Sequence, residues 1–228
     1  MRLPRIVETE DGSFTYFNEE FDQIYHSKSG AIEESFKKYV EPAKIKDSMT
    51  IVDYCFGLGY NTLAAIAKFD NLVIYALEID ALLMGNLTEL TFAELKGYDE
   101  DFKNTIDETF LEMATKLKEH IANEETDFVI EVRTSKIHVL VGDATQTISQ
   151  VPLNSTDAIF WDPFSPKQHP QLWEQSEFAK GYAVLKKGGI LATYSYARVV
   201  RDGLNAVGFD VRDGPVIGRR CPSTLAFK

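Results

Sequence analysis

Residues 52–61 read Val52-Asp53-Tyr54-Cys55-Phe56-Gly57-Leu58-Gly59-Tyr60-Asn61, and they lie between a short apolar run and a helical pattern. Gly57 and Gly59 let the backbone turn sharply and approach a ligand closely. The helix that follows would present unpaired N–H donors at its first turn, as nucleotide-binding folds do. The third glycine of the dinucleotide fingerprint is missing, so a purely structural turn is the alternative at this point.

Apolar runs alternate with helical patterns along the chain beyond this turn. We expect strands at 50–55, 71–77, 128–133, 137–141, 156–161 and 189–195, a closing antiparallel pair at 208–213 and 224–227, and helices at 62–68, 173–185 and 198–207. Such alternation is typical of βαβ units, in which helices cover both faces of a parallel sheet. The sequence therefore predicts an α/β fold with a mostly parallel, seven-stranded sheet.

Two segments stand apart from this pattern. Residues 1–48 are expected to form an N-terminal extension, with a hairpin that turns at Asp11-Gly12 and a helix within 20–40 that ends before Pro42. Residues 49–228 are expected to form the core domain. This domain would carry a charged helical insert near 87–125, in which apolar residues recur at helical spacing.

Acidic residues follow two of the predicted strands. Glu78 ends the second strand, where a carboxylate can accept both ribose hydroxyls of an adenosine. Asp143, in the turn Gly142-Asp143-Ala144, could accept a hydrogen bond from an adenine amino group, or it could simply cap the next helix. Together with the glycine turn, these acids indicate a nucleoside site at the carboxyl edge of the sheet.

A third acid begins a rigid turn, Asp162-Pro163-Phe164-Ser165-Pro166, directly after another strand. Two prolines fix the backbone there. The turn resembles the Asp/Asn-Pro-Pro-aromatic turn of amino-group methyltransferases, in which the acid or amide accepts hydrogen bonds from the target nitrogen. An acceptor of this kind orients the amine and stabilises the positive charge that grows on it. A rigid connection capped by Asp162 is the structural alternative.

Composition sets limits on the class of protein. The 228-residue chain is 44% hydrophobic, carries a net charge of −11 and has no apolar run long enough to cross a membrane. The two cysteines, Cys55 and Cys221, form no disulfide framework, so we expect a reducing, cytoplasmic location. The scattered histidines predict no metal site. Acids gather in 87–125 and bases in 186–228, which makes the C-terminal fifth basic.

Taken in chain order, these pieces resemble the methyltransferase domain of the MnmC family, which modifies the wobble uridine of tRNA, and above all its stand-alone versions without an oxidase domain. The resemblance covers nearly the whole chain. It rests most strongly on Asp162-Pro163-Phe164-Ser165-Pro166 followed by Pro170-Gln171-Leu172-Trp173, and also on Thr9-Glu10-Asp11-Gly12-Ser13-Phe14-Thr15, Tyr25-His26-Ser27-Lys28-Ser29-Gly30-Ala31, Val200-Arg201-Asp202-Gly203-Leu204 and Gly218-Arg219-Arg220.

The resemblance implies a class I, Rossmann-like methyltransferase fold with S-adenosyl-L-methionine as cofactor. Asp162 would be the catalytic residue, beside the transferred methyl group and the incoming amine. The implied cofactor-binding residues are Tyr25, Gly30, Glu34, Phe56, Gly57, Gly59, Asn61, Glu78, Asp143, Ala144 and Asp162. Three of these, Tyr25, Gly30 and Glu34, would close over the cofactor from the N-terminal segment.

The implied activity is N-methylation of 5-aminomethyl-(2-thio)uridine at the wobble position. The anticodon region of tRNA would contact Pro163, Phe164, Lys167, Arg198, Arg201, Arg219 and Arg220. The alternative for these arginines is ion pairing with Asp202, Asp210 and Asp213. Since the chain leaves no room for an oxidase, a separate enzyme would have to make the aminomethyl group.

Two other functions fit the same residues. A methyl- or aminopropyltransferase acting on a small amine would suit the negative net charge, since its substrate would be cationic. A cofactor-binding scaffold without catalysis would use the acidic insert as a docking surface. Replacing Asp162 by alanine separates an enzyme from a scaffold, because only an enzyme would lose turnover.

Overall fold

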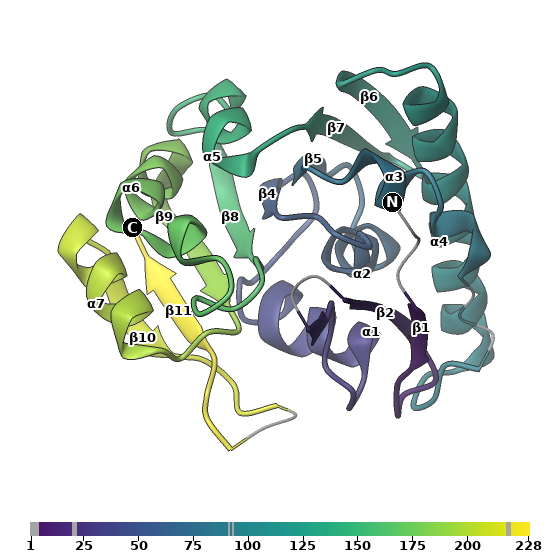
Figure 1. Cartoon of the computed structure of the whole chain (residues 1–228), viewed down its shortest axis with the longest axis horizontal. Helices are drawn as coiled ribbons and strands as arrows, with labels where there is room; N and C mark the ends of the chain where they lie inside the picture. Colours follow the sequence, from purple (N-terminus) through teal and green to yellow (C-terminus); the bar gives the residue numbers. More distant parts are fainter. Residues whose placement is uncertain (1–4, 20–21, 91, 93, 218–219) are drawn as a thin grey trace.

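The main sheet of the computed structural model, which describes residues 5–19, 22–90, 92, 94–217 and 220–228, lies at the centre of the molecule (Figure 1). In spatial order its strands are β10 (Asp210–Asp213), β11 (Thr224–Phe227), β9 (Leu185–Thr193), β8 (Thr156–Trp161), β4 (Thr50–Tyr54), β5 (Val73–Glu78), β7 (Ser135–Val141) and β6 (Asp127–Val132). The five strands from β9 to β7 are mutually parallel, and the flanking strands are antiparallel. The mostly parallel α/β sheet is thus confirmed.

The sheet has eight strands, one more than the predicted seven. Each of the eight strands corresponds to a run expected from the sequence, with β6 at the expected 128–133, so only the stated number of seven was too low. Strand β6 joins β7 through a tight turn at Arg133 and Thr134. Phe128 and Ile130 on β6 are buried, whereas Val129 between them is exposed. This alternation is typical of an antiparallel strand with one solvated face, and it extends a parallel core by one edge strand.

Side-chain alternation divides the core into two layers. On β4, Ile51 belongs to one buried cluster, while Val52 and Tyr54 belong to the other. On β8, Phe160 belongs to the cluster of Ile51, and Trp161 belongs to the cluster of Val52 and Tyr54. Because alternate residues of a strand point to opposite faces, Asp53 and Asp162 lie on the side of Ile51 and Phe160.

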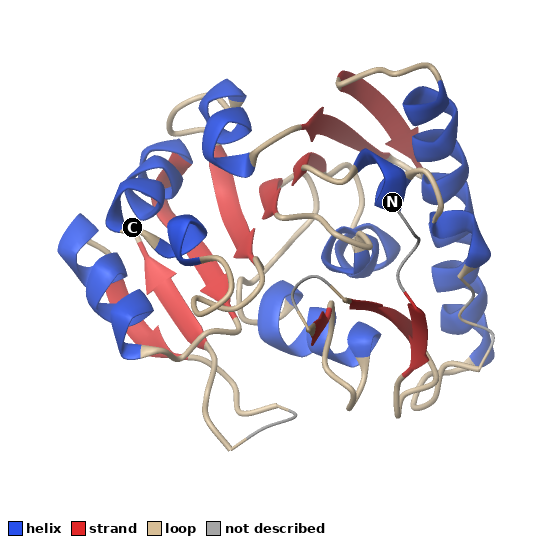
Figure 2. Ribbon diagram, in the orientation of Figure 1, coloured by secondary structure: helices blue, strands red, loops and turns tan. Residues whose placement is uncertain are grey.

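Helices cover both faces of this sheet (Figure 2). The face of Ile51 carries α1 (Ala31–Glu34), the π-helix η1 (Ser35–Val40), α2 (Tyr60–Lys68) and α4 (Glu100–Ala122), and the opposite face carries α5 (Ala144–Thr147), α6 (Gln175–Val184) and α7 (Arg198–Val207). The short helices are α3 (Ala81–Met84) and the 3₁₀ turns η2 (Leu87–Glu89), η3 (Ile148–Gln150) and η4 (Pro170–Trp173). In the described part of the chain, no helix combines the length and the apolar character that crossing a bilayer requires.

The insert near 87–125 is helical only in part. Asp99 caps α4 by accepting a hydrogen bond from Phe102 N at 2.8 Å, so the long helix begins at Glu100. Its buried face, with Ile106, Phe110 and Met113, packs on α2 and β6. The charged residues of the predicted insert therefore lie mainly on the outer face of one amphipathic helix.

The N-terminal extension is a three-stranded sheet followed by the helical segment of α1 and η1. Strands β1 (Arg5–Glu8) and β2 (Phe14–Asn18) form the predicted hairpin, and β3 (Gln23–Ile24) pairs with β2. Because residues 23–24 pair as a strand, the helix predicted within 20–40 begins only at Ala31. The extension contacts the core domain directly, since Tyr60 Oη donates a hydrogen bond to Phe14 O at 2.7 Å.

Candidate functional site

A cavity of about 1300 Å³ lies at the carboxyl ends of the parallel strands. Strands β4, β5 and β7 proceed outward in one direction, and the chain then returns to place β8 on the other side of β4. Open α/β sheets bind ligands at such a switch point, because the loops that follow the two neighbouring strands diverge there. The glycine turn follows β4, and the Asp162 turn follows β8, so both lie at this point.

The glycine turn forms one wall of the cavity. Gly57 has φ +56° and lines the cavity, and a Cβ there would lie 3.3 Å from the Tyr25 ring. Gly59, with φ +76°, precedes α2, and its Cβ would lie 2.4 Å from the ring of Phe56. Phe56 and Gly59 thus support the turn from behind, while Gly57 faces the cavity. The positive φ of Gly57 favours glycine there, and the Tyr25 ring leaves little space for a side chain.

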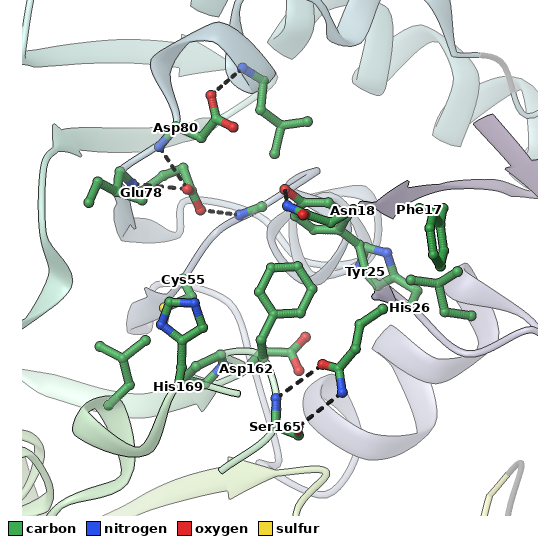
Figure 3. Close-up of a pocket in the computed structure, with 18 of the residues that line it drawn as sticks. Phe17, Asn18, Tyr25, His26, Cys55, Glu78, Asp80, Asp162, Ser165 and His169 are labelled. Carbon is green, nitrogen blue, oxygen red and sulfur yellow. Dashed lines mark hydrogen bonds between the residues drawn. The ribbon is translucent and has the colours of Figure 1, made fainter. Parts of the chain in front are cut away.

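Glu78 ends β5 beside this turn. Its Oε2 accepts a hydrogen bond from Gly57 N at 2.7 Å, and its Oε1 accepts from Ile79 N and Asp80 N at 2.9 Å each. The residue is 8% exposed, and burial raises the pKa of its carboxyl above the usual value. Figure 3 shows Glu78 and Asp80 on one side of the pocket, opposite Phe17, Asn18 and Tyr25.

Asp143 and Ala144 line the cavity after β7. The Asp143 carboxylate also accepts a hydrogen bond from Thr145 N at 2.9 Å, so it caps α5. The structural and the functional interpretations of Asp143 are therefore compatible. One carboxylate oxygen serves the cap, and lone pairs remain for a ligand in the cavity.

Asp162 lies at the base of the cavity, held by two donors. Its Oδ1 accepts a hydrogen bond from Tyr39 Oη, and its Oδ2 accepts one from Asn61 Nδ2 at 2.9 Å. Burial and the negative charge of Glu34 raise the pKa of Asp162 to about 8, although both hydrogen bonds favour the charged form. A carboxyl with this pKa exchanges protons near neutral pH, as general acid–base groups do.

Asn61 does not line the cavity but sits in the wall behind it, 2% exposed. Its Nδ2 donates to Asp162, while Asp53 is fully buried and accepts hydrogen bonds from Thr62 N at 3.2 Å and Thr62 Oγ1 at 2.7 Å. Burial raises the pKa of Asp53 to about 7. The amide of Asn61 therefore holds Asp162 in place rather than presenting itself to a ligand in the cavity.

The N-terminal segment supplies the opposite wall. Tyr25 and Glu34, which are predicted to close over the cofactor, line the cavity, and Glu34 forms an ion pair with the buried Lys38. Gly30 is placed differently from the prediction. A Cβ at Gly30 would lie 2.6 Å from Asp11 Oδ2, so this glycine permits close packing within the extension and does not line the cavity.

The Asp162 turn is tied to the N-terminal segment across the cavity. The Tyr25 and Phe164 rings meet edge to face with centroids 4.9 Å apart. Gln23 donates from Nε2 to Ser165 Oγ at 3.0 Å and accepts from Ser165 N at 3.3 Å. Sequence reasoning missed Gln23 and Tyr39, since nothing local marks either residue as a partner of a turn more than a hundred positions away.

The residues predicted to contact tRNA separate into two groups. Pro163 and Phe164 line the cavity, whereas Lys167, Arg198, Arg201 and Arg220 do not, and Arg219 lies outside the described residues. Arg198 Nε lies 3.3 Å from Asp202, and an Arg201 guanidinium nitrogen lies 2.9 Å from Asp213. In this structure, both arginines therefore form the ion pairs that the alternative interpretation expects. An exposed pair such as that of Arg198 is weak, at about 0–1 kcal/mol, so it exchanges readily. Arg201 is held more firmly, because it also donates to Arg212 O at 3.4 Å and to Thr224 Oγ1 at 3.3 Å.

Across the residues that the structure describes, no group of histidine, cysteine, aspartate and glutamate side chains is arranged to hold a metal ion. The carboxylates of Glu78, Asp143 and Asp162 come from three separate strand ends. They line one cavity of about 1300 Å³, which suits an organic ligand with several polar groups.

Comparison with known proteins gives a consistent result. A family model described as S-adenosyl-L-methionine-dependent methyltransferase matches residues 105–228. An uncharacterized protein of Methanocaldococcus jannaschii is 31% identical over 98% of this chain and 59% of its own length. The tRNA 5-methylaminomethyl-2-thiouridine biosynthesis bifunctional protein MnmC of Actinobacillus pleuropneumoniae is 27% identical over 90% of this chain, which spans 32% of that relative.

Solved structures agree with this comparison. The crystal structure of MnmC2 from Aquifex aeolicus superposes with a TM-score of 0.74 at 27% identity, covering 100% of this chain and 71% of that one. Spermidine synthase in complex with a transition-state analogue superposes with a TM-score of 0.51 at 11% identity, which shows a common fold and nothing more. The predicted resemblance to MnmC methyltransferase domains is confirmed.

Proposed function

The chain belongs to the S-adenosyl-L-methionine-dependent methyltransferase family, and from this premise we propose that it N-methylates 5-aminomethyl-(2-thio)uridine at the tRNA wobble position. The observation that supports the proposal most is Asp162, a carboxyl fixed at the base of the cavity by two hydrogen-bond donors. The relatives named for 5-methylaminomethyl-2-thiouridine biosynthesis support the substrate. We also propose that a separate enzyme makes the aminomethyl group.

The residues around the cavity fit the cofactor, S-adenosyl-L-methionine. Because Gly57 has no side chain, a ligand can approach the backbone closely at this turn. The buried Glu78 would hold the ribose hydroxyls, and Asp143 with Ala144 would hold the adenine. Carboxylates from three strand ends suit a ligand that presents hydroxyl, amino and sulfonium groups. When bound, the cofactor supplies an electrophilic methyl group on a positively charged sulfur.

In the transfer step Asp162 would act on the incoming amine, from its place beside the sulfonium of the cofactor. A primary amine arrives largely protonated at neutral pH, and it must lose a proton before its lone pair can react. Asp162 would take that proton onto its carboxylate and then accept hydrogen bonds from the neutral amine. Phe164 and Tyr25 would provide the aromatic surface beside the uracil ring. Most of the rate would come from orientation and from stabilising the charge that develops on nitrogen.

Binding of the cofactor should depend on pH through Asp162. Below about pH 8 this carboxyl is mainly protonated in the free protein, because its pKa is raised to about 8 by burial and by Glu34. A sulfonium favours the ionised form, so affinity for S-adenosylmethionine should rise with pH, by at most about tenfold per unit, and level off above pH 8. S-adenosylhomocysteine has no sulfonium. Calorimetric titrations of both ligands from pH 6 to 9 would measure the ratio of their affinities.

The affinity ratio isolates Asp162, because both ligands share the same α-amino group and the same ribose. We expect the ratio to increase between pH 6 and 8 in the wild type and to be flat in Asp162→Asn. A flat ratio in the wild type would contradict the placement of Asp162 beside the sulfonium.

A small-amine transferase remains the second candidate, because the net charge of −11 favours cationic substrates. The two functions separate in a transfer assay with labelled S-adenosylmethionine. We expect label in tRNA from cells that lack wobble methylation and none in fully modified tRNA or in a panel of aliphatic diamines. Transfer to the diamines alone would favour the small-amine function. Loss of tRNA labelling at high salt would add support, since phosphate contacts weaken as salt rises.

A further inference from the structure

We propose that Tyr39 is a positioning residue for the reaction, one that fixes the plane and the charge of the Asp162 carboxylate. The inference rests on the proposed function only for the role of Asp162. The contact itself is intramolecular and can be tested without any methyl acceptor.

The geometry assigns one donor to each carboxylate oxygen. Tyr39 Oη donates to Oδ1, and Asn61 Nδ2 donates to Oδ2 at 2.9 Å. Tyr39 is 0% exposed and Asn61 is 2% exposed, whereas Asp162 lines the cavity. Both donors therefore approach from the wall behind the carboxylate. The lone pairs that remain on each oxygen are left for groups in the cavity.

The local backbone explains how Tyr39 reaches Asp162. Residues 35–40 form a π-helix, in which Glu41 N bonds to Phe36 O at 2.9 Å. π-Helical turns are rare and occur often at functional sites, because the wider turn changes the direction of its side chains. The Tyr39 ring packs edge to face on Phe160, with centroids 5.8 Å apart, which holds the hydroxyl beside the end of β8.

Negative charges around Asp162 oppose its ionisation, and the Tyr39 hydroxyl counters them by donating a hydrogen bond to the carboxylate. Glu34 from α1 and Asp53 from β4 both act to raise the pKa of Asp162. Lys38 forms an ion pair with Glu34, the Cys55 thiol lies close enough to interact with Asp162, and Tyr194 interacts with Tyr39. A hydroxyl that donates to the carboxylate favours the ionised form. Burial and Asp162 keep Tyr39 itself protonated, since they raise the pKa of its hydroxyl well above the usual value.

The test compares Tyr39→Phe with Tyr60→Phe. Tyr60 is also 0% exposed and also donates one hydrogen bond, to Phe14 O, so its variant loses a buried hydroxyl without touching Asp162. In Tyr39→Phe we expect the pH midpoint of the S-adenosylmethionine to S-adenosylhomocysteine affinity ratio to move to higher pH. We expect kcat at pH 7 to fall by about tenfold. Tyr60→Phe should keep the wild-type midpoint.

Fluorotyrosine at position 39 gives a second, opposite readout in a protein of nearly unchanged shape. A fluorinated phenol is a stronger donor, so the midpoint should move to lower pH. The proposal is overturned if the midpoints of the wild type, Tyr39→Phe and the fluorotyrosine protein coincide, whatever happens to thermal stability. If the midpoints move as expected but the wild type methylates no acceptor, the positioning role stands and the proposed function fails.

Discussion

Replacing Asp162 by alanine should reduce methyl transfer by about 10²- to 10⁴-fold, the range measured when a proton acceptor or a charge-stabilising group is removed. Asp162→Asn should lose nearly as much, because an amide keeps one acceptor oxygen but cannot take a proton from the incoming ammonium. Affinity for S-adenosylhomocysteine should stay within about threefold of the wild type, since its thioether carries no charge for Asp162 to stabilise.

Asp157→Asn is the matched control for this change. Asp157 lies near the start of the same strand, β8, where it accepts a hydrogen bond from Thr50 N at 2.8 Å and pairs with Lys186 at 2.8 Å. It is remote from the cavity-lining residues, so its variant should keep full activity. Single-turnover rates with saturating cofactor would measure the effect. If Asp162→Ala methylated tRNA at the rate of Asp157→Asn, Asp162 would have no part in the chemistry.

Replacing Glu78 should weaken cofactor binding by about 10- to 100-fold, because hydrogen bonds to charged groups contribute about 1.5–3 kcal/mol. The expected loss is in affinity and not in kcat at saturation, because the ribose is held equally in the ground state and the transition state. Glu78→Gln keeps the size of the side chain and one acceptor oxygen, although its amide nitrogen cannot accept a hydrogen bond from the backbone N–H groups that the second carboxylate oxygen binds.

Glu177→Gln controls for the loss of a buried carboxylate. Glu177 is 6% exposed and pairs with Lys180 on the opposite face of the sheet, away from the cavity. Titration calorimetry with S-adenosylhomocysteine would compare the two variants. Equal affinities for Glu78→Gln and Glu177→Gln would show that Glu78 does not hold the ribose.

Much of the fold follows from local sequence. The apolar runs around Gly57 and Gly59 predicted the parallel core, since buried parallel strands need long apolar stretches and their turns need glycines. The hairpin was also predictable from local sequence, since Asp11-Gly12 is a turn dipeptide. The short β3 depends on pairing with β2, so the start of the first helix was wrong. The edge strand β6 was expected at 128–133, and the stated number of seven strands is one fewer than the sheet contains.

The candidate site was predictable where a residue follows a strand. Glu78, Asp143 and Asp162 all end strands, and the topology brings them to one cavity. The partners of Asp162 were not predictable. Tyr39 reads as an ordinary apolar position of a helix, and it lies 123 positions from the carboxylate that it contacts. Gly30 was assigned to the cofactor, but tertiary packing against Asp11 accounts for it.

The roles of the basic residues near the C-terminus could not be assigned from the sequence. Sequence alone left tRNA contact and ion pairing open for Arg198 and Arg201. The structure pairs Arg198 with Asp202 one helical turn away, which is a local contact, whereas Arg201 pairs with Asp213 on β10. The Arg198 pair lies at the surface, where a phosphate could compete for the arginine, whereas Arg201 is mostly buried and also donates to Arg212 O and Thr224 Oγ1. Their contact with tRNA stays a prediction.

The most direct test of the account is the position of the transferred methyl group. Wild-type protein would be given S-adenosylmethionine with an isotope-labelled methyl group and tRNA from cells that lack wobble methylation, and the digested nucleosides would be analysed by mass spectrometry. The account predicts one labelled nucleoside, 5-methylaminomethyl-(2-thio)uridine, with the label on the exocyclic nitrogen. Label on a ring atom or a ribose oxygen, or label confined to small amines, would contradict it.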